Sequence, residues 1–152
     1  MIGGGGRKLL SVAGKHADIV SIVPMLSSSF PPKSIKDYSL DSVKEKISWV
    51  KESALRNGRD PDEIKVALFS YNVLVSDDTD DYVDYTSKIY GISKEAYCNL
   101  PSTWIGSGVE IRDKLRHIRD ETGITSFQFL TRPPNMMERI EKFSEQVIKP
   151  LS

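Results

Sequence analysis

Hydrophobic residues recur along the chain with two different periods, and each period predicts one kind of element. Short segments rich in apolar residues at 17–23, 64–75 and 124–130 predict strands, and the second is nearly continuous in apolar residues, as a strand covered on both faces should be. Between and after them, apolar residues spaced three or four apart predict helices, most clearly at 42–57 and 136–147. This alternation predicts an α/β fold in which parallel strands alternate with helices in right-handed βαβ units.

The helix predicted at 42–57 has the clearest boundaries. Its buried stripe consists of four apolar residues at helical spacing: Val43, Ile47, Val50 and Ala54. Ser42 and Glu45, three residues apart, predict a capping box at its start. Gly58 stands where a helix commonly ends in the left-handed conformation. A second capping box, Ser107 with Glu110, predicts the start of a later helix.

Two polar features interrupt this regular pattern. Ser70 and Asn72 fall on one face of the strand at 64–75, where they either pair internally or line a cavity; internal pairing is the favoured interpretation. The acidic run at 77–81 contains the residue types that bind metal ions. Its spacing does not match a calcium-binding loop, and carboxylates at the start of a helix complement the helix dipole, so we interpret the run as a helix start.

The segment 24–39 has no helical period and is rich in serine, proline and lysine. Its double proline, Pro31-Pro32, excludes a helix and predicts a surface loop. Loops that follow parallel strands often carry functional residues, so this segment is either a lid over a site or an idle connection.

A run of four glycines at 3–6 directly precedes the first predicted helix. That helix presents apolar residues on one face: Leu9, Leu10, Ala13 and Ala17. Glycine lets a ligand approach the backbone, and the helix N-terminus with Arg7 and Lys8 favours an anion such as phosphate. The run is neither a dinucleotide fingerprint, because Lys8 replaces the third glycine, nor a P-loop. A flexible leader is the alternative, but the strand at 17–23 favours a βαβ unit.

Length and composition indicate an ordinary globular protein. The 152 residues suffice for a single domain, 1–152, with 39% hydrophobic and 28% charged residues. Basic and acidic residues both number 21, which indicates no nucleic-acid partner. The single cysteine, Cys98, cannot form an internal disulfide, and no apolar run is long enough for a membrane span. We therefore expect a cytoplasmic protein that does not bind membranes.

Four segments together resemble the luciferase-like monooxygenase superfamily, and most closely its branch that uses the deazaflavin coenzyme F420. The first is the opening, which reads I-G-G-G-G-R-x-L-x-x-x-A-x-x-x-A-D-I-V over 2–20. The others are D-P-D-E-I at 60–64, L-P-S-T-W-I-G-S at 100–107 and G-I-T-S-F at 123–127. The resemblance extends over essentially the whole chain, which matches only the later part of the family's fold.

The resemblance implies the C-terminal half of a (β/α)8 TIM barrel. It also implies that four residues contact the phosphate-bearing tail of F420 or, alternatively, of a flavin such as FMN: Gly4, Gly5, Gly6 and Arg7. The family's first four strands, which carry the residues that hold the flavin or deazaflavin ring, have no counterpart in this sequence. The catalytic residues are accordingly unknown, and no metal ligand is expected.

Two functions remain open from the sequence. The first is a half-barrel oxidoreductase that transfers hydride between F420 or flavin and an unknown substrate. The second is a non-enzymatic remnant or an oligomerising interaction module with residual phosphate affinity. Because half a barrel leaves sheet edges open, we expect a homo-oligomer, a separate chain that supplies the missing half, or a rearranged compact fold.

Overall fold

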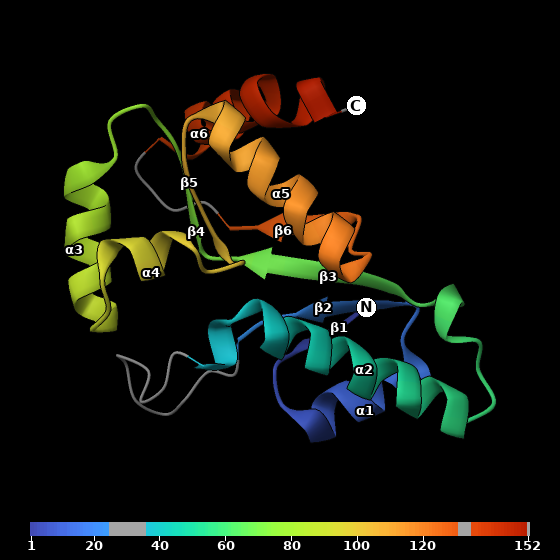
Figure 1. Cartoon of the computed structure of the whole chain (residues 1–152). Coiled ribbons are helices and arrows are strands. Elements are labelled where there is room, and N and C mark those ends of the chain that lie inside the picture. The colour runs from blue at the N-terminus through green and yellow to red at the C-terminus, as the bar shows by residue number, and fades with distance from the viewer. Residues whose placement is uncertain (25–35, 131–134, 152) are drawn as a thin grey trace. The chain divides into compact units, whose positions relative to one another are not determined.

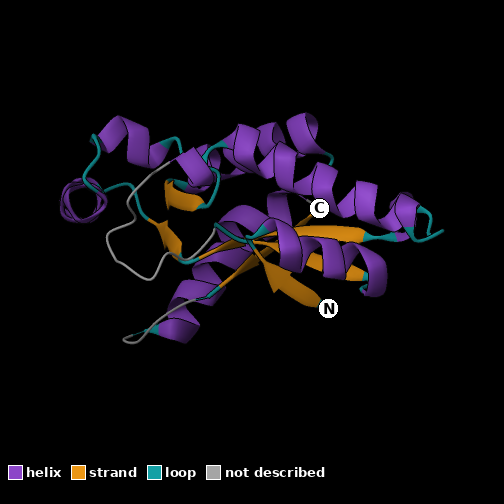
Figure 2. Ribbon diagram, turned by 90° about the horizontal axis from the view of Figure 1, so that it is seen from below, coloured by secondary structure: helices purple, strands orange, loops and turns teal. Residues whose placement is uncertain are grey.

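The computed structural model describes residues 1–24, 36–130 and 135–151, in which strands and helices alternate (Figure 2). The strands are β1 (Ile2–Gly4), β2 (Ile19–Ile22), β3 (Lys65–Ser70), β4 (Asn72–Val75), β5 (Thr103–Gly106) and β6 (Ser126–Phe129). The α-helices are α1 (Arg7–His16), α2 (Leu40–Arg56), α3 (Asp80–Tyr90), α4 (Lys94–Cys98), α5 (Gly108–Thr122) and α6 (Met136–Phe143). Short 3-10 turns occupy Lys36–Tyr38, Pro61–Glu63 and Lys149–Leu151, and a π-helical turn occupies Ser144–Ile148.

The main sheet has four strands in the order β1-β2-β3-β6 (Figure 1). β1 pairs with β2 and β2 pairs with β3, both in parallel. The carboxyl ends of these three strands therefore meet at one edge of the sheet, where Gly4, Ile22 and Leu68 are in register. The predicted α/β fold with parallel strands alternating with helices is confirmed.

The single strand predicted at 64–75 is wrong, because the chain leaves the main sheet at Tyr71. Its second part, β4, pairs in parallel with β5 in a separate two-stranded sheet. Ser70 lies at the break, where its hydroxyl donates to the carbonyl of Ser102 at 2.6 Å and accepts from the N–H of Asn72 at 3.1 Å. The favoured internal pairing of Ser70 is therefore confirmed. The strand β5 was not predicted from the sequence.

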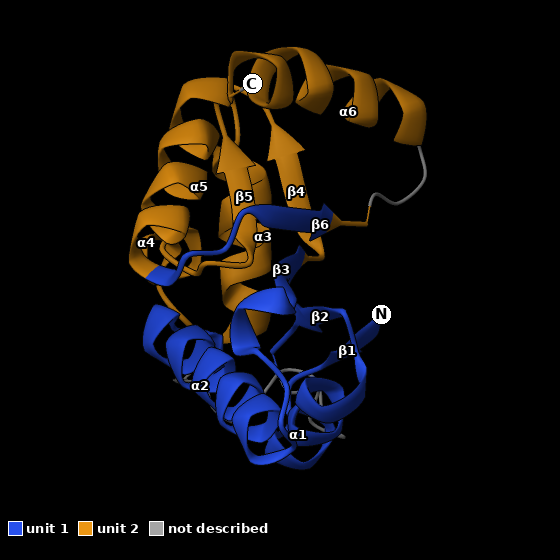
Figure 3. Ribbon diagram, turned by 90° about the vertical axis from the view of Figure 1, so that its right-hand side faces the viewer, with its two compact units in different colours: residues 1–69, 122–128 blue, residues 70–121, 129–152 orange. Residues whose placement is uncertain are grey.

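The described chain divides into two compact units (Figure 3). Unit 1 consists of 1–69 and 122–128, and unit 2 consists of 70–121 and 129–152. Each unit draws on two separate stretches of sequence, so the chain passes between the units more than once. The single domain expected from the length is not tested by this division and stays a prediction.

In unit 1, α1 and α2 pack against each other and against the main sheet (Figure 1). Their shared core contains seven buried residues: Leu10, Ala13, Ala17, Val20, Val50, Ala54 and Ile64. The two helices approach each other closely at Gly14, where a Cβ would collide with the carbonyl oxygen of Val50 and lie 3.0 Å from the Cβ of Ser53. The hydroxyl of Ser53 donates to the carbonyl of Ser11 at 2.6 Å, which fixes this approach. The buried stripe predicted on α2 is confirmed.

In unit 2, aromatic side chains form the centre of the core. Trp104 is fully buried and stacks on Phe143 with ring centroids 6.2 Å apart, while Phe129 approaches Phe143 to 4.6 Å. The indole N–H of Trp104 donates to the carbonyl of Pro101 at 2.8 Å. The buried indole is thereby hydrogen-bonded, as burial of a polar group requires.

Several helix ends and one buried helix face differ from the prediction. α2 begins at Leu40 rather than after Ser42, because the hydroxyl of Ser39 accepts from the N–H of Ser42 at 3.1 Å and acts as the cap. On α1 the buried face turns toward Gly14, and Leu9, predicted on that face, is 46% exposed. α6 ends at Phe143, where the helix loosens into the π-helical turn. The capping box of Ser107 and the left-handed Gly58 were predicted correctly.

Candidate functional site

The glycine turn joins β1 to α1 at the carboxyl edge of the main sheet. Gly4 and Gly5 are buried, and Gly6 is the N-cap of α1 with extended backbone angles. The carbonyl of Gly4 accepts from the N–H of Val23 at 3.1 Å, which ties the turn to the end of β2. The turn is therefore held in place by the sheet itself.

The N-terminus of α1 has no side chain of its own to satisfy its first N–H groups. Gly6 supplies no side-chain cap, and the first turn contains no acidic residue. The first N–H groups of an α-helix have no partner within the helix, and the helix dipole places partial positive charge there. Arg7 and Lys8, both exposed, add full positive charges to the same turn. This end of α1 can accept an anion.

Gly4 and Arg7, two further residues of the turn, lie next to particular side chains. A Cβ on Gly4 would lie 2.5 Å from a methyl carbon of Leu9, so the absence of a side chain at Gly4 makes room for Leu9. The Arg7 guanidinium lies 5.8 Å from the ring centroid of Trp49 and 3.9 Å from a carboxylate oxygen of Glu52. Both charged groups of this ion pair are more than half exposed, so water screens the pair and Arg7 can reorient at little cost.

A buried lysine, which the sequence analysis did not predict, lies at the same edge of the sheet. Lys46 on α2 is 1% exposed, and its ammonium group donates to the carboxylate of Asp37 at 2.8 Å. The same group donates to the backbone carbonyls of Val23 at 3.2 Å and Asp37 at 3.3 Å. These three acceptors match the three N–H donors of an ammonium group. One sequence feature could have indicated the burial of Lys46: it lies three residues after Val43, at the border of the buried stripe.

A polar pair occupies the face of the main sheet that points away from α1 and α2. Neighbouring residues on a strand point to opposite faces, so Ser21 lies opposite the core residue Val20. The Ser21 hydroxyl donates to the side-chain carbonyl of Gln128 at 2.8 Å. Ser21 is in register with Gly3 and Ala67, which leaves this part of the face lined by small side chains.

The remaining candidates from the sequence are the loop at 24–39, the acidic run at 77–81 and Cys98. Of the loop predicted at 24–39, residues 25–35 lie outside the described part of the chain, and its role as a lid is untested. Within the described residues, no group of three or more His, Cys, Asp and Glu residues is arranged to hold a metal ion. The acidic run at 77–81 leads into α3, which begins at Asp80. Burial raises the pKa of the Cys98 thiol, which disfavours the reactive thiolate.

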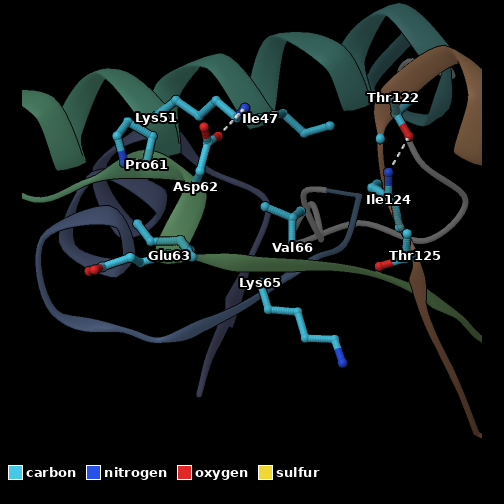
Figure 4. Close-up of a pocket in the computed structure, with 12 residues that line it drawn as sticks. Ile47, Lys51, Pro61, Asp62, Glu63, Lys65, Val66, Thr122, Ile124 and Thr125 are labelled. Atoms are coloured by element: carbon cyan, nitrogen blue, oxygen red, sulfur yellow. Dashed lines mark hydrogen bonds and ion pairs between the residues drawn. The ribbon is translucent and has the colours of Figure 1, made fainter.

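A cavity of about 360 Å³ lies in unit 1, between α2 and the segments that lead into β3 and β6 (Figure 4). Its lining is Ile47, Lys51, Pro61, Asp62, Glu63, Ile64, Lys65, Val66, Thr122, Gly123, Ile124 and Thr125. Lys51 and Asp62 approach to 3.4 Å at its rim. Lys65 begins β3 and pairs with Ile19 at the start of β2, so the cavity lies at the amino edge of the sheet, opposite the glycine turn. It is not part of the turn's site.

The fold is shared with several solved structures of enzymes named for work with F420 or FMN. The F420-dependent tetrahydromethanopterin reductase from Methanopyrus kandleri is 17% identical and matches 99% of this chain and 50% of its own, with a TM-score of 0.68. An F420-dependent secondary alcohol dehydrogenase, solved with an F420-acetone adduct, is 18% identical over 96% of this chain and 47% of its own, at 0.64. Riboflavin lyase, solved with modified FMN and riboflavin, is 12% identical over 98% and 41%, also at 0.64.

This chain has about half of the luciferase-like fold. The predicted resemblance is thereby confirmed at the level of the fold, and the chain spans about half the length of the solved structures it matches. No family model and no curated protein sequence matches the chain. Among the described residues, no helix is long and apolar enough to cross a membrane.

Proposed function

We propose that the chain is the half of a luciferase-like oxidoreductase that binds the phosphate-bearing tail of coenzyme F420, with FMN as the alternative cofactor. Gly4, Gly5, Gly6 and Arg7 form the binding turn. When bound, the cofactor supplies the hydride chemistry, while the protein binds and orients it. These four residues give no information about the substrate.

One observation carries the proposal: the N-terminus of α1 is open and positively charged, and it directly follows a strand at the carboxyl edge of the sheet. The N–H groups of Arg7 and Lys8 stand in the first turn, where phosphate oxygens can accept them. Gly4 contributes by letting Leu9 pack close to β1. The fold supports F420 in particular, since two of the solved structures that share it are named as F420-dependent.

The test adds a carboxylate at the open helix end. Gly6→Asp places an acceptor at the N-cap, where aspartate accepts from the first-turn N–H groups and stabilises a helix by a few tenths of a kcal/mol relative to glycine. The same carboxylate repels phosphate. We therefore expect F420 affinity, followed by fluorescence titration, to fall at least about tenfold, while the thermal midpoint does not fall. Gly6→Asn is the matched control, because it caps the helix without a charge and should lose less affinity.

Two outcomes contradict the proposal. One is that wild-type chain, folded by circular dichroism, binds neither F420 nor FMN; the non-enzymatic interaction module is then the remaining function. The other is saturable binding that Gly6→Asp leaves unchanged, which moves the cofactor away from this turn.

A further inference from the structure

The buried ammonium group of Lys46 is linked to the glycine turn through Val23. Lys46 donates to the carbonyl of Val23 at 3.2 Å, and the N–H of Val23 donates to the carbonyl of Gly4 at 3.1 Å. Val23 directly follows β2, so Lys46 fixes the point at which the chain leaves this strand. A chain of hydrogen bonds therefore runs from α2, past the end of β2, to the turn that precedes α1.

Lys46 supports its neighbours and is not itself available to a ligand. Its side chain is 1% exposed. Its three N–H donors match three acceptors, which are the carbonyl of Val23 and the carbonyl and carboxylate of Asp37. A buried ammonium group can turn away from such partners only by leaving polar and charged groups unpaired, which is costly. Any effect of Lys46 on an anion at the turn must therefore act through Val23.

We propose that Lys46 is a positioning residue for the glycine turn and that, by fixing Val23, it holds the turn in the shape that accepts phosphate. This inference rests on the proposed function, because it assigns Lys46 to the same site. Backbone N–H groups bind an anion well when they are held in place before it arrives. Gly5 and Gly6 have no side chains that could stiffen the turn. Support must come through the backbone, and the bond from Val23 to Gly4 supplies it.

Arg59 offers a matched control, because it supports the other end of α1. Its guanidinium donates to the carbonyls of Gly14 at 3.2 Å and Ala17 at 2.9 Å, and it lies 3.4 Å from the carboxylate of Asp18. Like Lys46, Arg59 is thus a cation that holds backbone carbonyls and contacts one carboxylate. These contacts lie at the C-terminal end of α1, away from the glycine turn. Loss of Arg59 should therefore lower stability without changing the turn.

The first readout is the affinity of the intact chain for F420, or for FMN if wild type binds only FMN, followed by fluorescence titration. Lys46→Met keeps an unbranched side chain and removes the three donors, so we expect the affinity to fall at least about tenfold. Arg59→Met should change the affinity less than about twofold, although urea denaturation should show that both variants lose stability. Should the lone Asp37 carboxylate unfold Lys46→Met, Asp37→Asn with Lys46→Met is compared with Asp37→Asn alone, where the same tenfold difference is expected.

The second readout, amide hydrogen exchange, needs no cofactor and separates this inference from the proposed function. In Lys46→Met the N–H of Val23 should exchange at least about tenfold faster. The N–H of Lys65, which donates to the carbonyl of Asp18 at 2.9 Å at the amino edge of the sheet, reports general loosening and should change less.

Two results overturn the inference. One is exchange at Val23 that does not change, or that changes only as much as exchange at Lys65. The other is an affinity of Lys46→Met that equals the affinity of Arg59→Met. A wild-type chain that binds neither cofactor contradicts the proposed function instead, and exchange at Val23 then still decides whether Lys46 holds the turn.

Discussion

The starts of α1 and α5 look alike in the sequence and differ in the structure. α1 directly follows Gly6, and Gly106 and Gly108 flank the start of α5. At α5, however, the hydroxyl and N–H of Ser107 each donate to the Glu110 carboxylate at 2.8 Å, and the N–H of Glu110 donates to the Ser107 hydroxyl at 3.3 Å. At α1 no side chain of the described residues takes this role. α5 thus caps its own first turn, whereas the first turn of α1 has no side-chain cap. A glycine before a helix indicates an anion site only where no nearby side chain competes for the same N–H groups.

The largest expected effect concerns the contact between α1 and α2. Because α1 has no side-chain cap, this contact is a candidate for what holds the helix in place. If the contact with α2 does so, Gly14→Val should lower the free energy of unfolding by about 3 kcal/mol, because the new side chain collides with the Val50 carbonyl. Lys15→Val, the same substituted residue at the next, exposed position, should cost far less. Urea denaturation measures both. Equal effects would show that helix propensity, rather than this contact, decides the stability of α1.

A second prediction concerns how α5 is held. Lys114 donates to the backbone carbonyls of Cys98, Leu100 and Thr103. Burial lowers its pKa to about 8 from the ordinary 10.5. Between these two values the unfolded chain binds more protons, so the Lys114 contribution to the free energy of unfolding should rise with pH. We expect about 2 kcal/mol, below the full linkage value because the side chain is partly exposed.

The measurement for Lys114 is a difference between two proteins. Burial raises the pKa values of Tyr97 and Cys98, which lowers stability at alkaline pH and opposes the Lys114 contribution. Subtracting the urea stability of Lys114→Met from that of wild type between pH 8 and 10 removes most of this background. A difference that stays constant across this interval would contradict the prediction.

The smallest expected effect concerns the cap at the start of α5, the other helix in this comparison. Hydrogen bonds from Ser107 hold the pKa of Glu110 below its ordinary value of 4.5. The cap therefore contributes stability above pH 4.5, and this contribution is lost as the pH falls through the lowered folded-state pKa. Glu110→Gln should cost about 1 kcal/mol at pH 7 and progressively less in acid. Acid unfolding curves for Glu110→Gln and wild type that run parallel throughout would exclude the charged cap.

The sequence located most elements because the signals were local. The stripe from Val43 to Ala54 and the capping box of Ser107 depend on residues within one or two helical turns of each other. The break at Tyr71 was missed, because an apolar run at 64–75 has the same composition whether it stays in one sheet or crosses to another. The N-cap of α2 was predicted at Ser42 and is Ser39 in the structure. Both serines fit the local pattern, and only the preceding turn distinguishes them.

The sequence by itself determined the alternation of parallel strands and helices, the glycine turn before α1 and the resemblance to luciferase-like proteins. These depend on period and spacing, which the chain carries in any conformation. Tertiary structure alone decided that Leu9 faces outward, that Lys46 is buried against Asp37, and that the N-terminus of α1 is open. Each of these depends on which distant segment reaches a given side chain, and the energies of burial and hydrogen bonding are fixed only when those partners meet.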